Sequence, residues 1–231
     1  MAYLPIYLDL GGRRCVVVGG GAVAEQKART LLDAGAEVTV VSPLVTGGLE
    51  ELAAAGRVTR VARKYRHGDL GGFMLAYVAT GDAQLNREIA GEARERGVLL
   101  NVADAPELCS FIAPAVMKRG ELQIAISTGG ASPAFASRLR RELEGRYGAE
   151  YAMALAILRA ARRHLRATES EPAERSRKLR ALAASELPEC IRCGEVGALD
   201  ALLARHLGAG LEALGLKMPD LPPAGRDHAS R

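Results

Sequence analysis

Three consecutive glycines join an apolar run to a helix-forming run near the start of the chain, in RCVVVGGGAVAEQKARTLLDAG at residues 14–35. The segment RCVVVG is typical of a buried strand, and AVAEQKARTLLDAG is typical of a helix that ends at Gly35. Parallel strands need a crossover connection, which is most often a helix. This stretch therefore predicts an α/β fold built on a parallel sheet.

The same alternation continues through the first hundred residues. A second strand in AEVTVVSP stops at Pro43, because proline cannot donate to a sheet ladder. Strand and helix runs then follow one another in the pattern of a doubly wound half-sheet. We expect, in order, a helix around Gly48 to Ala55, strands in RVTRVARKY and FMLAYVAT, a helix in AQLNREIAGEARERG and a strand in VLLNVAD.

The glycine cluster has the spacing G-x-G-x-x-A, formed by Gly19, Gly21 and Ala24. A backbone without side chains can lie against a pyrophosphate, and a helix that begins there offers free N–H groups and the positive end of its dipole. The alternative is a tight turn alone, for which one glycine would suffice. A strand before the loop and a helix after it favour a Rossmann-type dinucleotide site. Its expected contacts are Gly19, Gly20, Gly21, Ala22, Val23 and Ala24.

The second strand ends in Ser42-Pro43, where dinucleotide folds often carry an acidic residue that holds the adenosine ribose. We therefore expect the Ser42 hydroxyl or backbone groups of Ser42 and Pro43 to hold this ribose. No arginine adjoins Ser42 in the sequence to take a 2′-phosphate, which favours NAD over NADP. Thr80 ends a later strand and is expected beside the nicotinamide half, although Thr80 and Asp82 could equally end a strand and cap a helix.

Asp104 follows the next strand, at the edge of the sheet where open α/β folds bind ligands. Its carboxylate could act as a base in the crevice, or it could only start the turn before Pro106. Position alone leaves both interpretations open.

A second glycine pair precedes another predicted helix start, at Ser132-Pro133. Free N–H groups at this start, together with nearby hydroxyls and a guanidinium, could hold a carboxylate. The alternative for Ser132 is a plain helix cap. The candidate anion contacts are Ser127, Thr128, Gly129, Gly130, Ser132 and Arg138.

The βα alternation breaks at Pro106. SFIAPAVMKRGELQIAISTGG predicts a hairpin that turns at Lys118 to Gly120 and is well placed to pair with a second copy of the chain. From Glu150 onward the sequence has no strand signals, and we expect three or four helices, over about 150–167, 172–186 and 195–214. The predicted organisation is a dinucleotide-binding Rossmann domain over 1–112, a dimerisation segment of hairpin plus helix over 113–148, an all-α domain over 149–218 and a disordered tail over 219–231.

A net charge of +4 suits an anionic partner, but aromatic residues make up only 4% of the chain and tryptophan is absent, so base stacking on single-stranded nucleic acid has little support. No apolar run approaches the roughly 18–20 residues that cross a bilayer, and the N-terminus lacks a signal-peptide pattern, so we expect a cytoplasmic protein without membrane contact.

Scattered histidines, and a Cys190–Cys193 pair without a second such pair, predict no preformed metal site. Four arginines share one helical face and form either a solvated surface or a contact for a polyacidic substrate: Arg159, Arg162, Arg163 and Arg166.

Taken together, these stretches resemble the precorrin-2 dehydrogenase family, the module that also forms the N-terminal part of sirohaem synthases. Gly81 departs from the family, which more often has a second acidic residue beside Asp82. The resemblance covers roughly residues 3–147 and rests on LPIYLDL at 4–10, VVVGGGAVAEQKARTLLDAGAEVTVVSP at 16–43, VATGDAQLN at 78–86, NVADAPELCSFIAPA at 101–115 and STGGASPAFASRLRRELE at 127–144.

The resemblance implies a homodimer in which NAD accepts a hydride from precorrin-2 and proton loss leaves sirohydrochlorin. Precorrin-2 carries eight carboxylates, which would account for a basic protein. In the family the aspartate that matches Asp104 is the favoured acid/base group, and the serine that matches Ser132 lies at the tetrapyrrole site. Some members also insert ferrous iron to give sirohaem, which the residues here leave open. The alternative from another class is a regulatory Rossmann protein that senses NAD(H) without catalysis.

Overall fold

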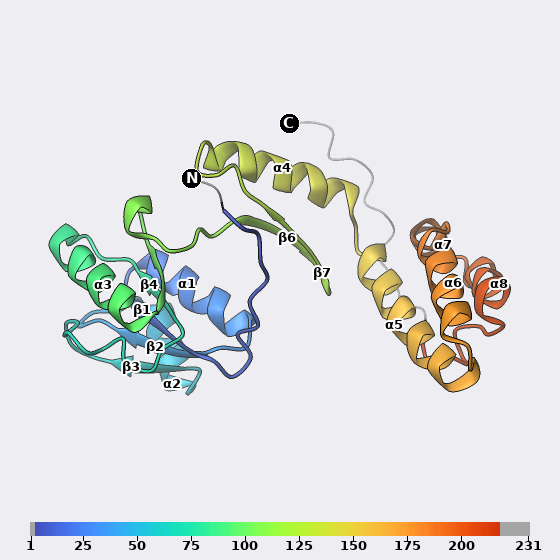
Figure 1. Ribbon diagram of the computed structural model, residues 1–231, viewed down its shortest axis with the longest axis horizontal. Coiled ribbons are helices and arrows are strands. Elements are labelled where there is room, and N and C mark those ends of the chain that lie inside the picture. Colours follow the sequence, from blue (N-terminus) through green and yellow to red (C-terminus); the bar gives the residue numbers. More distant parts are fainter. Residues whose placement is uncertain (1–2, 218–231) are drawn as a thin grey trace. The chain divides into compact units, whose positions relative to one another are not determined.

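A five-stranded parallel sheet lies at the centre of the first of two units into which the chain divides, between Ala113 and Pro114 (Figure 1). The computed structural model describes residues 3–217. The strands pair in the order β3-β2-β1-β4-β5, all parallel. Their bounds are Arg14–Val18 (β1), Glu37–Val41 (β2), Val58–Val61 (β3), Leu75–Val78 (β4) and Leu99–Val102 (β5).

Three helices cover the two faces of this sheet. The helices α1 (Ala22–Asp33) and α2 (Gly47–Ala54) share one apolar cluster with side chains of β1, β2 and β4. The helix α3 (Ala83–Arg96) shares a second cluster with the alternate side chains of β1 and β4 and with those of β5. The chain reverses its direction across the sheet between β1 and β4, and in open α/β sheets a ligand crevice forms at such a point.

The predicted α/β class is confirmed, but two strands are shorter than expected. The run RVTRVARKY forms strand only over β3, because Arg63 leaves the ladder and makes two hydrogen bonds to the Asp69 carboxylate, at 2.7 and 2.8 Å. The run FMLAYVAT forms strand only over β4, whose four residues are all buried. The end of β3 is therefore fixed by a side-chain contact that the β propensity of the sequence does not reveal.

The second unit begins with the hairpin of β6 (Ala115–Arg119) and β7 (Leu122–Ile126). These strands form an antiparallel sheet of their own, not an extension of the parallel sheet. The helix α4 (Pro133–Arg146) packs against the hairpin, and Met117 is fully buried in this part of the chain. Among the described residues, β6 and β7 are the two strands of this sheet.

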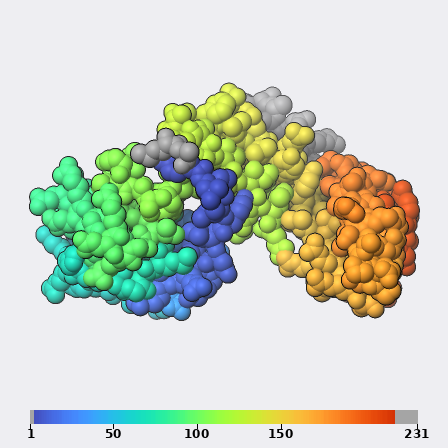
Figure 2. All heavy atoms as spheres, viewed as in Figure 1, coloured from blue at the N-terminus to red at the C-terminus, as the bar shows by residue number. Residues whose placement is uncertain are grey.

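Four helices follow, and in the space-filling view they form a closely packed group (Figure 2). The sequence predicts three or four helices in this region, but the segment expected as one helix over 172–186 ends at Ala183, and a short separate helix follows it. Arg192 of that short helix donates two hydrogen bonds to the buried Glu150 carboxylate, at 2.8 and 3.0 Å. The bounds are Glu150–Thr168 (α5), Pro172–Ala183 (α6), Leu187–Cys193 (α7) and Val196–Leu207 (α8).

The predicted disordered tail over 219–231 lies outside the described residues. Within residues 3–217, no helix is both long enough and apolar enough to span a membrane.

Candidate functional site

Each of the three positions after β1 is occupied by glycine for a different structural reason. Gly19 has a φ of +123°, and a Cβ there would collide with the Ala79 carbonyl oxygen. A Cβ on Gly20 would collide with the Leu44 carbonyl oxygen and would lie 2.8 Å from the Ser42 hydroxyl. Gly21 differs, because a Cβ added there would meet no atom within 4 Å. Two glycines thus allow close packing of the loop, and the third faces open space.

That open space lies at the amino end of α1. Gly21 occupies the N-cap position, and no side chain caps the helix. The first intrahelical bond is donated by Glu25 to the Gly21 carbonyl, so the N–H groups of Ala22, Val23 and Ala24 have no acceptor among residues 3–217. Unpaired N–H groups and the positive end of the helix dipole favour an anion at this position. The residues present therefore fit the pyrophosphate of a dinucleotide.

The loop after β2 lies against the glycine loop, since the Thr46 amide donates to the Gly20 carbonyl at 2.9 Å. The Thr46 hydroxyl also donates to the Glu25 carboxylate at 2.5 Å, which ties the loop to α1. This hydrogen bond, with those from Arg29, holds the pKa of the Glu25 carboxyl below its ordinary value. The loop where an adenosine ribose is expected is therefore fixed in place.

Within this loop the Ser42 side chain is buried, and its hydroxyl donates to the Leu44 carbonyl oxygen at 2.6 Å. The hydroxyl proton is therefore not free for a ribose. The backbone offers little more, because the Ser42 amide donates to the Val61 carbonyl at 3.2 Å and the Pro43 carbonyl accepts from Arg60 at 3.2 Å. Among the expected contacts, the Ser42 carbonyl is the group without a hydrogen-bond partner in the described residues.

A pocket of about 530 Å³ opens beyond the carboxyl ends of the strands in the first unit. Val23 from the first turn of α1, Thr80 from the end of β4 and Asp104 from the end of β5 line it together. These three positions were predicted separately from the sequence, and the fold places them around one cavity. The pocket thus joins the exposed helix start to the candidate acid/base group.

Asp104 has a φ of +58°, the left-handed region, and is the one non-glycine residue with a positive φ in the described part of the chain. This conformation is unusual for a residue with a Cβ, although aspartate tolerates it better than most. The Asp104 side chain is exposed at the pocket and makes no hydrogen bond to any residue from 3 to 217. A carboxylate without a protein partner is free to exchange a proton with a ligand.

Thr80 and Asp82 both have structural partners at the end of β4. The Asp82 carboxylate caps α3 by accepting from the amides of Gln84 and Leu85, each at 3.0 Å. The Thr80 hydroxyl donates to the Asn86 side-chain oxygen at 2.6 Å and still lines the pocket. Asp82 is therefore a helix cap, whereas Thr80 combines a structural bond with a position at the cavity.

Three polar residues of the pocket were not singled out in the sequence: Asn86, Arg87 and Glu107. Asn86 and Arg87 lie on the first turn and a half of α3, and Glu107 lies in a short 3₁₀ helix, Pro106–Leu108. The signal for Asn86 was present in VATGDAQLN, because a residue four positions after a helix cap returns to the strand end that precedes it. Arg87 makes no ion pair with a described residue and places a cation at the cavity.

The candidate anion contacts of the second unit bond mainly to one another. The Thr128 hydroxyl donates to the Ser132 carbonyl and accepts from the Ser132 amide, both at 3.1 Å, and the Ser127 hydroxyl accepts from the Gly129 amide at 3.0 Å. Gly129 and Gly130 have φ values of +63° and +89°. This local turn accounts for both glycines without an anion.

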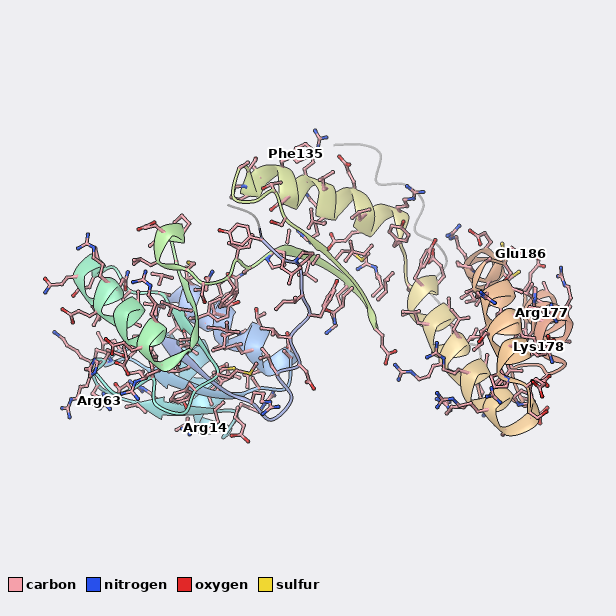
Figure 3. The ribbon with its side chains drawn as sticks, viewed as in Figure 1. Arg14, Arg63, Phe135, Arg177, Lys178 and Glu186 are labelled. Atoms are coloured by element: carbon pink, nitrogen blue, oxygen red, sulfur yellow. The ribbon has the colours of Figure 1, made fainter. Side chains whose placement is uncertain are left out.

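Ser132 is the N-cap of α4, where its hydroxyl oxygen accepts from the Phe135 amide at 3.2 Å. Arg138 pairs with Glu142 at 3.1 Å, and its guanidinium lies 5.0 Å from the centre of the Phe135 ring, which points away from the hairpin in Figure 3. A capping oxygen that accepts a bond can still donate its proton. Ser132 therefore keeps one free donor, and the role of these residues toward a substrate stays a prediction.

The arginine face of α5 divides into two parts. Arg159 forms an ion pair with Glu121, which occupies part of its charge. The other three arginines, Arg162, Arg163 and Arg166, are exposed.

Among residues 3–217, no group of three or more His, Cys, Asp or Glu side chains is arranged to hold a metal ion, and the four cysteines are unbonded thiols.

Two protein-family models match the chain. The model described as “Putative NAD(P)-binding” matches residues 6–115, and the model described as “Sirohaem biosynthesis protein central” matches residues 119–146. The first covers the glycine loop and the pocket, so the first unit is an NAD(P)-binding domain. The second covers the hairpin turn and α4.

Curated relatives and a solved structure agree with these matches. The siroheme synthase of Azotobacter vinelandii is 37% identical over 93% of this chain and 47% of the relative, and that of Pseudomonas aeruginosa PAO1 is 39% identical over 91% of this chain and 45% of the relative. The chain thus spans about half the length of these relatives. A structure described as “SirC, precorrin-2 dehydrogenase” matches with a TM-score of 0.73 and 28% identity, covering 81% of this chain and 92% of that one.

Proposed function

The chain belongs to the family of precorrin-2 dehydrogenase/ferrochelatase modules that form the N-terminal part of sirohaem synthases, and on this premise we propose that it oxidises precorrin-2 to sirohydrochlorin with NAD as the hydride acceptor. The observation that carries the proposal is the pocket of about 530 Å³, where the exposed start of α1 and the uncommitted Asp104 carboxylate meet. A dinucleotide held by that helix start would reach toward the same cavity.

The reaction removes one hydride and one proton from precorrin-2, and NAD supplies the acceptor for the hydride when it is bound. The residues of this chain have the remaining tasks. The N–H groups of Ala22, Val23 and Ala24 bind the pyrophosphate, and Thr80 forms the wall of the cavity beside the reacting groups. The Asp104 carboxylate accepts the proton that leaves the macrocycle, because it has no competing protein donor.

Precorrin-2 brings carboxylates that need cationic or N–H partners. Arg87 is the cation that lines the pocket, and it makes no ion pair with a described residue. Ser132 retains a hydroxyl proton, and Arg138 is more than half exposed although it is paired with Glu142. We propose that these groups, with the loop from Ser127 to Gly130, bind substrate carboxylates.

We further propose a homodimer that forms through the hairpin. β6 and β7 pair only with each other among residues 3–217, and Val116 on β6 is 41% exposed. The outer edge of β6, which carries this exposed apolar side chain, is a template for pairing with a second chain. Light scattering on the purified protein tests this, and a monomer at micromolar concentration would contradict it.

Incubation with precorrin-2 and NAD in the absence of oxygen tests the proposed activity. An enzyme gives the absorption spectrum of sirohydrochlorin, whereas a regulatory NAD(H) sensor binds the dinucleotide and leaves precorrin-2 unchanged. Iron insertion is tested separately by adding ferrous iron to sirohydrochlorin. Sirohaem formed above the spontaneous rate would add a ferrochelatase activity, with iron as a substrate.

A further inference from the structure

Arg60 of β3 lies beside the loop where an adenosine ribose is expected. Its Nη2 atom donates to the Pro43 carbonyl oxygen at 3.2 Å, one residue beyond Ser42. The sequence has no arginine next to Ser42, which favoured NAD over NADP, but the fold brings one there from 17 residues away. We propose that Arg60 binds the 2′-phosphate of NADP, so that the chain accepts NADP as well as NAD; this rests on the dinucleotide site of the proposed function.

The register of the sheet explains why Arg60 reaches this position. Arg60 pairs with Val40, one residue before the end of β2, so its side chain starts near the carboxyl edge of the sheet. In dinucleotide folds the group that distinguishes the ribose 2′-hydroxyl from a 2′-phosphate lies at this end of the second strand. The guanidinium is therefore at the position where a 2′-phosphate would be recognised.

The guanidinium of Arg60 is only partly satisfied by the protein. Besides the bond to Pro43, its Nη1 atom lies 3.5 Å from the Glu50 carboxylate, at the long limit for a hydrogen bond. Its Nε atom is buried and has no hydrogen-bond partner among the described residues. The side chain is 28% exposed, so solvent or a ligand reaches it. A guanidinium has five N–H donors in a planar fork, which matches phosphate oxygens.

The loop also lacks the group that excludes NADP in many related folds. An acidic residue at the end of the second strand holds the ribose hydroxyls of NAD and repels a 2′-phosphate. Ser42 stands there instead, and its hydroxyl bonds to the Leu44 carbonyl. The acid on this side of the site is Glu50 of α2, which is 61% exposed and paired with the same guanidinium. No carboxylate at the end of β2 thus opposes a phosphate.

Neighbouring cations are less suitable for this role. Arg63, labelled in Figure 3, makes two short hydrogen bonds to Asp69, which occupy its planar fork. Arg57 precedes β3 and therefore lies at the amino end of the strand, on the opposite edge of the sheet. Arg60 is the cation of β3 that combines the correct edge with free donors.

Titration calorimetry with NAD and with NADP tests the proposal on the full chain. The wild type should bind the two dinucleotides with dissociation constants within about tenfold of each other. Arg60→Gln keeps a donor for the Pro43 carbonyl but removes the charge, and it should weaken NADP binding by about ten- to hundredfold, the size of one or two charge-assisted hydrogen bonds. Its effect on NAD should stay within about threefold.

Arg57→Gln is the matched control, since it removes the same charge at the other edge of the sheet, and it should leave both dissociation constants unchanged. NAD binding with NADP more than a hundredfold weaker in the wild type would overturn the role of Arg60 alone. Equal weakening of both dinucleotides by Arg60→Gln would do the same, because it would indicate a purely structural contact. If neither dinucleotide binds, the proposed function itself fails.

Discussion

Thr80 and Asn86 hold each other through two hydrogen bonds at the end of β4. The Thr80 hydroxyl donates to the Asn86 side-chain oxygen at 2.6 Å, and the Asn86 side-chain nitrogen donates to the Thr80 carbonyl at 3.3 Å. Both residues line the pocket, and Asn86 is buried. The pair links the strand end to α3, so the wall of the cavity is fixed before any ligand arrives.

Replacing Thr80 by valine tests whether this pair stabilises the wall. Valine removes the hydroxyl and leaves the buried Asn86 oxygen without its donor, which should lower the free energy of unfolding by about 1–3 kcal/mol. Thr80→Ser keeps the hydroxyl and should lose much less. Urea denaturation measures both, and equal midpoints for the valine variant and the wild type would show that the pair contributes nothing to stability.

Asp104→Asn should lower the dehydrogenation rate by about 10²–10⁴-fold, the usual contribution of a positioned acid/base group. Asparagine accepts the left-handed backbone conformation of this residue, so the fold should be unchanged. Glu107→Gln is the control, because Glu107 is a second carboxylate of the same pocket. Steady-state kinetics with NAD-binding titrations measure the effect, and near-normal turnover by the asparagine variant would remove Asp104 from catalysis.

Gly21→Asp should abolish dinucleotide binding, because its carboxylate would lie against the pyrophosphate. Gly21 has a φ of −81° and open space at its Cβ position, so the variant should fold normally. Gly21→Ala adds only a methyl group, so it separates the effect of side-chain bulk from the effect of charge. This variant should bind the dinucleotide more tightly than the aspartate variant. Unchanged NAD affinity in Gly21→Asp would place the dinucleotide elsewhere.

The Glu92 carboxyl of α3 should make the stability of the fold depend on pH. Its side chain is fully buried, which by itself raises the pKa of the carboxyl, but hydrogen bonds from the Tyr65 hydroxyl and the Gly68 and Leu70 amides outweigh burial and hold the pKa below its ordinary value. Because the pKa is lower in the folded state, Glu92 adds stability at pH values above its unfolded pKa of about 4.3. This stability is lost as the pH falls through the folded pKa.

Glu92→Gln should therefore cost about 1–3 kcal/mol at pH 7, because the buried donors lose their charged acceptor. The difference from wild type should shrink as the pH falls below about 4. Glu88→Gln, at an exposed position of the same helix, should have little effect at any pH. Thermal unfolding across this range measures the change, and a constant difference between Glu92→Gln and wild type would contradict the linkage.

The sequence predicted those parts of the site that depend on local chain order. The glycine loop and Asp104 each follow a strand directly, so their position at the carboxyl edge of the sheet follows from the strand alone. Arg87 and Arg60 could not be found in the same way. Their positions depend on how α3 packs and on how β3 pairs with β2, which are tertiary contacts.

The same limit explains the length of β3, whereas the end of α6 had a signal in the sequence. Arg63 ends β3 by bonding to Asp69, and this contact overrides the β propensity of the run that follows. The expected helix over 172–186 ends at Ala183, and α7 begins at Leu187 with Pro188 in its first turn. Proline starts a helix more readily than it continues one, which was a signal for the break in the sequence itself.

The most direct test follows sirohydrochlorin and reduced dinucleotide together in one anaerobic reaction with precorrin-2 and NAD. The account predicts that both appear at the same rate and in equal amounts, and that Asp104→Asn slows both equally while NAD still binds. Sirohydrochlorin formed without reduced dinucleotide, or NAD bound tightly while precorrin-2 stays unchanged, would contradict the claim that this pocket transfers a hydride.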